Sequence, residues 1–132
     1  FPLYFGIMGV MKDSGLAINI AEFFVSISTT ETLPIFTFMS AGLLNILVPS
    51  GGGQWAIQGP IIIESSHQLQ VPLPKMLMAM AYGDQITNML QPFWALPLLA
   101  ITKLKAYQIL PFTFWMFLIG SLIFIFGLVF IF

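Results

Sequence analysis

Residues 45–60 read NILVPSGGGQWAIQGP, and this stretch separates two apolar runs with a proline and three consecutive glycines. The run before it covers residues 33–48, and the run after it continues to residue 63. Neither run is comfortable as a complete membrane span, and short apolar runs flanked by helix breakers are typical of buried or re-entrant helices. The glycines at 51–53 offer the positive-φ freedom that a tight reversal requires. We therefore predict a re-entrant helical hairpin over residues 34–66, which enters and leaves the membrane by the same face.

The composition of the whole chain is that of a membrane protein. Of its 132 residues, 58% are hydrophobic and only 7% are charged, whereas a soluble domain carries about a quarter charged residues. The outer surface must therefore face lipid or other protein. A net charge of −1 provides no basic stripe for nucleic acid. With no Cys and a single His, we expect no metal centre and no redox cofactor.

The flanking segments predict an all-α, polytopic integral membrane fragment. Residues 109–132 carry no charge and would form a transmembrane helix about 36 Å long, enough for a ~30 Å hydrocarbon core. Residues 74–101 predict a discontinuous helix, broken at 88–92 because a proline removes a backbone donor. Residues 1–32 read as the end of a span followed by an interfacial or short helix.

The orientation and the extent of the protein can also be predicted. Lys103 and Lys105 precede the last helix, and the positive-inside tendency places them in the cytoplasm. The chain opens with Phe1 inside an apolar run and shows no charged leader. We therefore expect a piece of a longer multi-pass protein, whose N-terminal part would be a partner of this segment.

One set of polar side chains interrupts the apolar pattern of the discontinuous helix. Asp84, Thr87, Asn88 and Gln91 fall at i, i+3, i+4 and i+7, which would place them on one helix face. Asp84 lies ten residues after Pro74, about 15 Å along a helix and so near the bilayer midplane. An ionisable group there costs at least ~2.5–3.5 kcal/mol and is rarely kept without a partner or a function. One interpretation is a hydrogen-bond network between helices, and the other is a site for Na⁺ or a proton.

The hairpin would supply the complementary half of a site. A helix that restarts after the glycines presents free N–H groups and a positive dipole end, which suit a small carboxylate in a chain without Arg. Apolar walls would come from Trp55 and the Phe93–Trp94 pair, and Gln58 would add a polar group. The residues predicted to bind substrate are Asn45, Ser50, Gly51, Gly52, Gly53, Gln54, Asn88 and Gln91, and those predicted for cation or proton coupling are Asp84, Thr87 and Asn88. Neither GxxxxGK[ST] nor GxSxG occurs, and we expect no enzyme.

Three strings carry a resemblance to a known family. FPLYFGIMGVMKDSGLA, FMSAGLLNILVPSGGGQWAIQGP and AYGDQITNMLQPFWALPLLAI are similar to the C-terminal third of the bacterial short-chain fatty acid transporters, within the ion transporter superfamily. The resemblance implies an inner-membrane carrier of acids such as acetoacetate or butyrate, with two re-entrant hairpins and two unwound helices around a midplane site. It also implies an elevator-like movement of the transport domain.

The sequence leads us to expect a secondary transporter of a small monocarboxylate, embedded in the lipid bilayer and coupled to Na⁺ or H⁺. A carrier of another small carboxylate in the same superfamily, such as a dicarboxylate, and a structural membrane subunit are the alternatives. A homodimer is left open as a further partnership.

Overall fold

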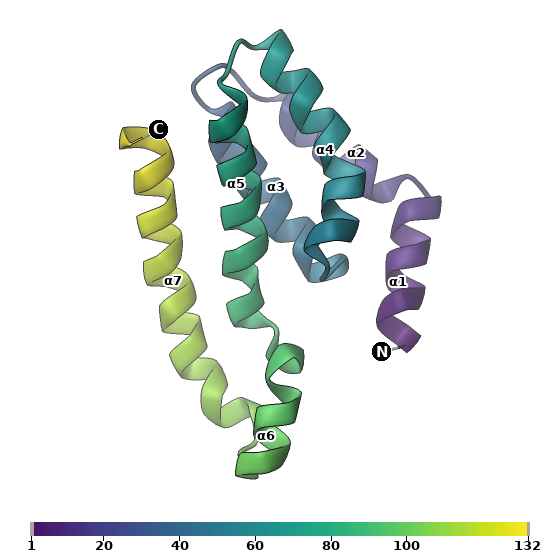
Figure 1. The fold of residues 1–132 in the computed structure, drawn as a ribbon, viewed down its shortest axis with the longest axis vertical. Helices are drawn as coiled ribbons and strands as arrows, with labels where there is room; N and C mark the ends of the chain where they lie inside the picture. The colour runs from purple at the N-terminus through teal and green to yellow at the C-terminus, as the bar shows by residue number, and fades with distance from the viewer. Residues whose placement is uncertain (1, 132) are drawn as a thin grey trace.

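The computed structural model describes residues 2–131, and this part of the chain is α-helical with no strand. Its α-helices are α1 (Pro2–Asp13), α2 (Leu16–Ser26), α3 (Leu33–Leu47), α4 (Gly51–Gln68), α5 (Leu73–Thr87), α6 (Leu96–Thr102) and α7 (Ala106–Phe130) (Figure 1). Two short 3-10 helices, Asn88–Leu90 and Pro92–Ala95, lie between α5 and α6. The prediction of an all-α fold is confirmed.

Helices α3 and α4 form a hairpin whose tip lies partway along the molecule and not at either end (Figure 1). The reversal occurs between Leu47 and Gly51, where Ser50 has extended backbone angles, φ −154° and ψ 106°. The Ser50 hydroxyl then accepts a hydrogen bond from the Gly53 N–H at 3.3 Å, which caps the first turn of α4.

The expected use of the glycines at the tip is wrong. Residues 51–53 form the first turn of α4, and within residues 2–131 the glycine with a positive φ is Gly15, between α1 and α2. The extended backbone of Ser50 makes the turn, so the glycines do not have to. Helix α4 therefore begins at Gly51, and not after the glycines as the sequence suggested.

The predicted break between α5 and α6 is present. After Thr87 the chain tightens into 3-10 geometry, and Gln91 is extended, with φ −112° and ψ 96°. A residue before a proline is disfavoured in the helical region, which explains why the interruption falls at Gln91. Helical structure resumes as a 3-10 turn, and α6 begins only at Leu96. The expectation that an α-helix restarts directly after Pro92 is therefore wrong.

Helix α3 is the centre of the fold. Its residues Leu33 and Ala41 pack in a core with Met76 and Met80 of α5, and its C-terminal turn packs against α2. Helix α2, whose placement the sequence left open, therefore lies against the hairpin. The approach of α3 to α5 is close, because a Cβ on Gly83 would overlap the Phe38 carbonyl oxygen.

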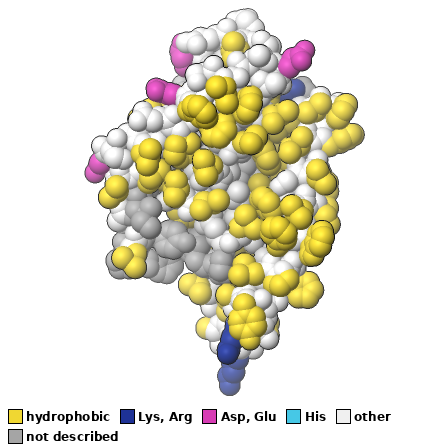
Figure 2. Space-filling model, turned by 180° about the vertical axis from the view of Figure 1, so that it is seen from behind, with side chains coloured by type: hydrophobic (Ala, Val, Ile, Leu, Met, Phe, Trp, Pro, Cys, Tyr) yellow, Lys and Arg dark blue, Asp and Glu magenta, His cyan; other side chains and the backbone are white. Residues whose placement is uncertain are grey.

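Helix α7 is the one helix within residues 2–131 that is long and apolar enough to cross a membrane. It lies along α5, where Phe124 stacks on Tyr82 with ring centroids 4.3 Å apart, and much of its remaining surface is exposed and apolar. Figure 2 shows apolar side chains over the middle of the molecule, basic side chains at its tapered end, and acidic side chains together with a further basic one in the opposite half. This distribution fits a bilayer around the middle and water at the ends.

Candidate functional site

Asn45, in the last full turn of α3, joins the hairpin to the broken helix. Its amide nitrogen lies 2.7 Å from the Asp84 carbonyl oxygen, 3.0 Å from the Thr87 hydroxyl and 3.0 Å from the Asn88 side-chain oxygen. The last carbonyls of a helix have no intrahelical partner, and this amide supplies a donor at the end of α5. Asn45 is 1% exposed, so these contacts are shielded from solvent.

Two further contacts fix the interrupted backbone. Gln91 donates from its side-chain nitrogen to the Asn45 carbonyl oxygen at 3.1 Å. Trp94 donates from its indole nitrogen to the Asn88 carbonyl oxygen at 2.7 Å. Asn88 and Gln91 therefore form hydrogen bonds to α3, as one of the two interpretations of the polar stripe predicted. Because the helix is broken, neither residue lies on the continuous helix face that the spacing indicated. Trp94 was expected to form an apolar wall of the site, but its indole instead donates a hydrogen bond to a carbonyl oxygen of the break.

Asp84 is the charged group at the meeting point of the hairpin and the broken helix. Its side chain is half-buried, and its Oδ1 is buried without a hydrogen-bond partner among the described residues. The carboxylate faces the beginning of α4, since a Cβ built on Gly51 would lie 3.6 Å from Oδ2 and 3.8 Å from Oδ1. A carboxylate is stabilised at a helix N-terminus by the free N–H groups and the helix dipole. Asp84 therefore already occupies the kind of position that the sequence suggested for a substrate anion.

Gln54 and Gln58 connect α4 to α3 away from the tip. The Gln54 side-chain nitrogen donates to the Ala41 carbonyl oxygen at 2.8 Å and to the Gln58 side-chain oxygen at 2.7 Å. Gln58 in turn donates to the Ser40 hydroxyl at 3.2 Å. Both glutamines are 1% exposed, and the Gln54 side-chain oxygen is buried without a partner in the described part of the chain. Ser40 was not predicted from the sequence, because its partner Gln58 is eighteen residues away.

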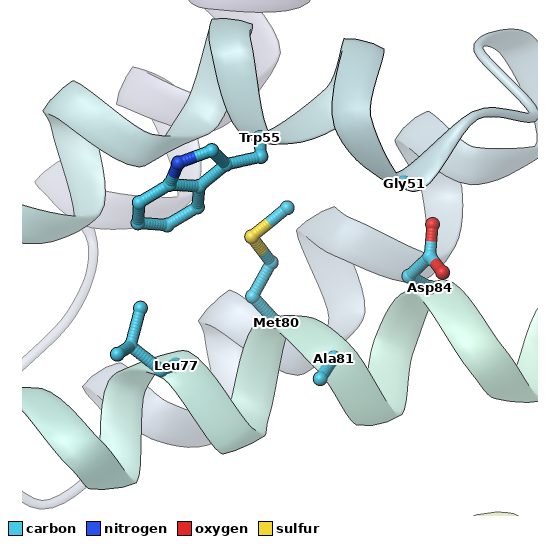
Figure 3. Close-up of a pocket in the computed structure, with 6 residues that line it drawn as sticks. All are labelled: Gly51, Trp55, Leu77, Met80, Ala81 and Asp84. Atoms are coloured by element: carbon cyan, nitrogen blue, oxygen red, sulfur yellow. The ribbon is translucent and has the colours of Figure 1, made fainter.

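A pocket of about 250 Å³ lies between α4 and α5 (Figure 3). Its lining residues are Gly51, Trp55, Leu77, Met80, Ala81 and Asp84. Asp84 and Gly51 form one end, while Trp55 and Leu77 lie at the other end, with Met80 and Ala81 between them (Figure 3). Leu77, Met80 and Ala81 were not predicted as site residues from the sequence. Their signal was present, since Leu77, Ala81 and Asp84 recur at i, i+4 and i+7.

The structure thus brings together most, but not all, of the predicted site. Asn45, Thr87, Asn88 and Gln91 form one network, and Asp84 meets Gly51 beside it. Ser50 and Gly52 are exposed at the tip. The side chain of Phe93 lies outside the described residues. Residues 2–131 contain no group of three His, Asp or Glu side chains arranged to hold a metal ion.

The family described as short chain fatty acid transporter matches residues 1–131. A protein of Escherichia coli strain K12, named as a candidate short-chain fatty acid transporter, is 47% identical over 97% of this chain and 29% of its own length. A protein of Haemophilus influenzae with the same name is 44% identical over 99% of this chain and 29% of its own length. No solved structure matches the chain.

The chain therefore spans less than a third of the length of these relatives, and the family name is that of a transporter and not of an enzyme. A match over nearly every residue, joined to an apolar helix of membrane-spanning length, also identifies a membrane protein. The chain belongs to the short-chain fatty acid transporter family.

Proposed function

We propose that this chain is part of a multi-pass secondary transporter that moves a short-chain fatty acid, such as butyrate or acetoacetate, across the bacterial inner membrane. Movement of the acid is coupled to Na⁺ or H⁺ at Asp84. The observation that carries the proposal is the half-buried Asp84 carboxylate, which has an unpartnered oxygen and lies between the start of α4 and the break after α5.

The geometry of the hairpin supports its insertion into the membrane from one side. Helix α3 has 15 residues and is about 22 Å long, shorter than a ~30 Å hydrocarbon core, whereas the 25-residue α7 is about 37 Å long. The tip lies partway along the molecule, near the break (Figure 1). Irregular backbone at membrane depth is tolerated only where protein covers it or where it lines a wet cavity. The bonds from Asn45 to the break provide such cover.

Electrostatics explains why coupling belongs at this site. A substrate carboxylate about 4 Å from the Asp84 carboxylate would meet a repulsion of about 4 kcal/mol at an effective dielectric constant of ~20. A proton or a cation held between the two groups removes this penalty. The acid and the coupling ion therefore bind together more favourably than the acid alone, which is the thermodynamic basis of symport.

The proposal is tested with Asp84→Asn in the full-length protein. Labelled butyrate uptake is measured in vesicles under an imposed proton or sodium gradient, with Asp13→Asn as the matched control because Asp13 is exposed at the end of α1. We expect the control to accumulate butyrate and Asp84→Asn only to equilibrate it. Gradient-driven accumulation that is unchanged in Asp84→Asn would remove the coupling function from this residue.

The same vesicles distinguish the other functions. Succinate that competes with labelled butyrate more strongly than unlabelled butyrate does would identify a dicarboxylate carrier. Uptake no greater than in vesicles without the protein would indicate a structural subunit.

A further inference from the structure

We propose that the pocket between α4 and α5 receives the alkyl chain of the transported acid, and that Ala81 and Leu77 set the longest chain that is accepted. This inference rests on the proposed function and adds a specificity-determining surface to it. Its basis is the order of the lining residues, which are polar at one end and apolar along the rest (Figure 3).

The polar end of the pocket is suited to the carboxyl group of a fatty acid. Asp84 and the backbone at Gly51 lie there, and the buried, unpartnered Oδ1 of Asp84 can accept a hydrogen bond from a protonated carboxyl group or share a cation with a carboxylate. An acid held at this end has its alkyl chain directed along Ala81 and Met80. The substrate therefore has one preferred orientation in the pocket.

The apolar end limits how far the alkyl chain extends. Leu77, Ala81 and Asp84 lie on one face of α5, and at about 1.5 Å per residue Ala81 is about 4.5 Å, and Leu77 about 10 Å, from Asp84 along the helix axis. A volume of about 250 Å³ is below the range of roughly 300–1,000 Å³ that drug-sized ligands occupy. The dimensions thus suit a few methylene groups, and a longer acyl chain would extend past Leu77 and Trp55, which are exposed.

The opposite wall has its own positioning residue. The indole of Trp55 lies against Gly59, where an added Cβ would be 2.9 Å from two ring atoms. Glycine at position 59 therefore lets the ring lie flat along α4. Gly59→Ala would push the ring away from its helix and so change the shape of the apolar wall, without touching the polar end of the pocket.

The experiment compares two substitutions that change the pocket in opposite directions. In the full-length protein, Ala81→Leu fills the middle of the pocket and Leu77→Ala opens its end. Uptake of labelled butyrate is measured in vesicles with acetate, butyrate, hexanoate or octanoate as competitors. Leu43→Ala is the matched control, because Leu43 is 44% exposed on α3, comparable with 38% for Leu77, and does not line the pocket.

We expect the hexanoate-to-acetate preference to fall by about 10-fold or more in Ala81→Leu, since a methylene in an apolar pocket is worth roughly 10-fold or more in specificity. Leu77→Ala should move the preference toward hexanoate and octanoate, and Leu43→Ala should leave it unchanged. A preference that stays that of the wild type in both pocket variants, while butyrate is still transported, overturns the inference and leaves the proposed function standing. If the wild-type protein transports no short-chain acid, the proposed function itself fails.

Discussion

At the scale of single residues, the side chain of Asn45 joins the hairpin to the broken helix. One side-chain nitrogen lies within 3.0 Å of three oxygen acceptors on two segments of the broken helix. Replacing this donor leaves acceptors at the end of α5 without this partner at a position where the side chain is 1% exposed. Leaving a buried polar group unsatisfied costs about 1–3 kcal/mol.

Asn45→Asp should therefore lower the free energy of unfolding of the full-length protein by about 1–3 kcal/mol, because the shape is kept but a donor is replaced by an acceptor. Thermal unfolding in detergent measures the change. The control is Asn19→Asp, at an exposed position of α2, which should melt as the wild type does. Equal melting temperatures for both variants would show that the amide does not hold the break.

The residue scale also shows what a sequence can predict about a site. Asn45, Thr87, Asn88 and Gln91 were predicted because polar side chains in apolar helices have few alternatives to a partner or a site. Their mutual bonds were not predictable, because the donor and its acceptors are separated by about forty residues. The apolar pocket residues were harder to find, because Leu77 and Ala81 look like any other residues of a buried or lipid-facing helix.

At the scale of elements, the packing of α3 on α5 depends on a glycine, which has no side chain to keep the helices apart. Gly83 faces the α3 backbone so closely that an added Cβ would lie 2.9 Å from the Gly42 nitrogen and would overlap the Phe38 carbonyl oxygen. Backbone cannot move aside as the end of a flexible side chain can. Gly83 is thus needed for the distance between the two helices.

Gly83→Ala should destabilise the full-length protein by about 1–3 kcal/mol or more, the usual effect of overpacking. Gly52→Ala is the contrasting change, since no described atom lies within 4 Å of a Cβ at Gly52 and its φ is not positive. The yield of folded protein and its melting temperature should fall for the first variant only. Loss of folding in Gly52→Ala would instead support the expectation from the sequence that the glycines take positive φ in a tight reversal.

The elements differ in how well the sequence predicted them. The interruption before Pro92 was predicted correctly from the missing N–H and fixed φ of proline. Proline does not always end a helix, because Pro60 and Pro111 lie inside α4 and α7. The turn of the hairpin was misplaced because a glycine only permits an unusual conformation and does not require one. Ser50, with its extended backbone and its capping bond to Gly53, is a typical N-cap residue. The prediction overlooked it because the turn was assigned to the three glycines that follow it.

At the scale of the whole molecule, the charges define two ends. Lys103 and Lys105 lie between the end of α6 and the start of α7, at the tapered end in Figures 1 and 2. The connection between α4 and α5 is at the opposite end (Figure 1). If the positive-inside rule holds for the complete protein, the lysine end is cytoplasmic and the hairpin enters from the outer face.

This orientation predicts the sidedness of chemical labelling. In an otherwise cysteine-free full-length protein, a cysteine at Leu104 should react with an impermeant maleimide only in inside-out vesicles. A cysteine at His67, in the last turn of α4, should react only in right-side-out cells. Both parent side chains are exposed in this part of the protein, which makes them suitable positions for labelling. Reaction of both positions from the same side would contradict the predicted crossing.

The contacts that hold the break also have a consequence for how the molecule tolerates a changing charge. Asn45, Asn88 and Gln91 are amides and Thr87 is an alcohol, and none of these groups gains or loses a proton at physiological pH. The net charge of the polar side chains around Asp84 is therefore the same at every physiological pH. Under the proposed coupling, binding or release of an ion at Asp84 would therefore leave the hydrogen bonds of Asn45, Asn88 and Gln91 unchanged, so the charge at Asp84 could change without weakening the contact between the hairpin and the broken helix.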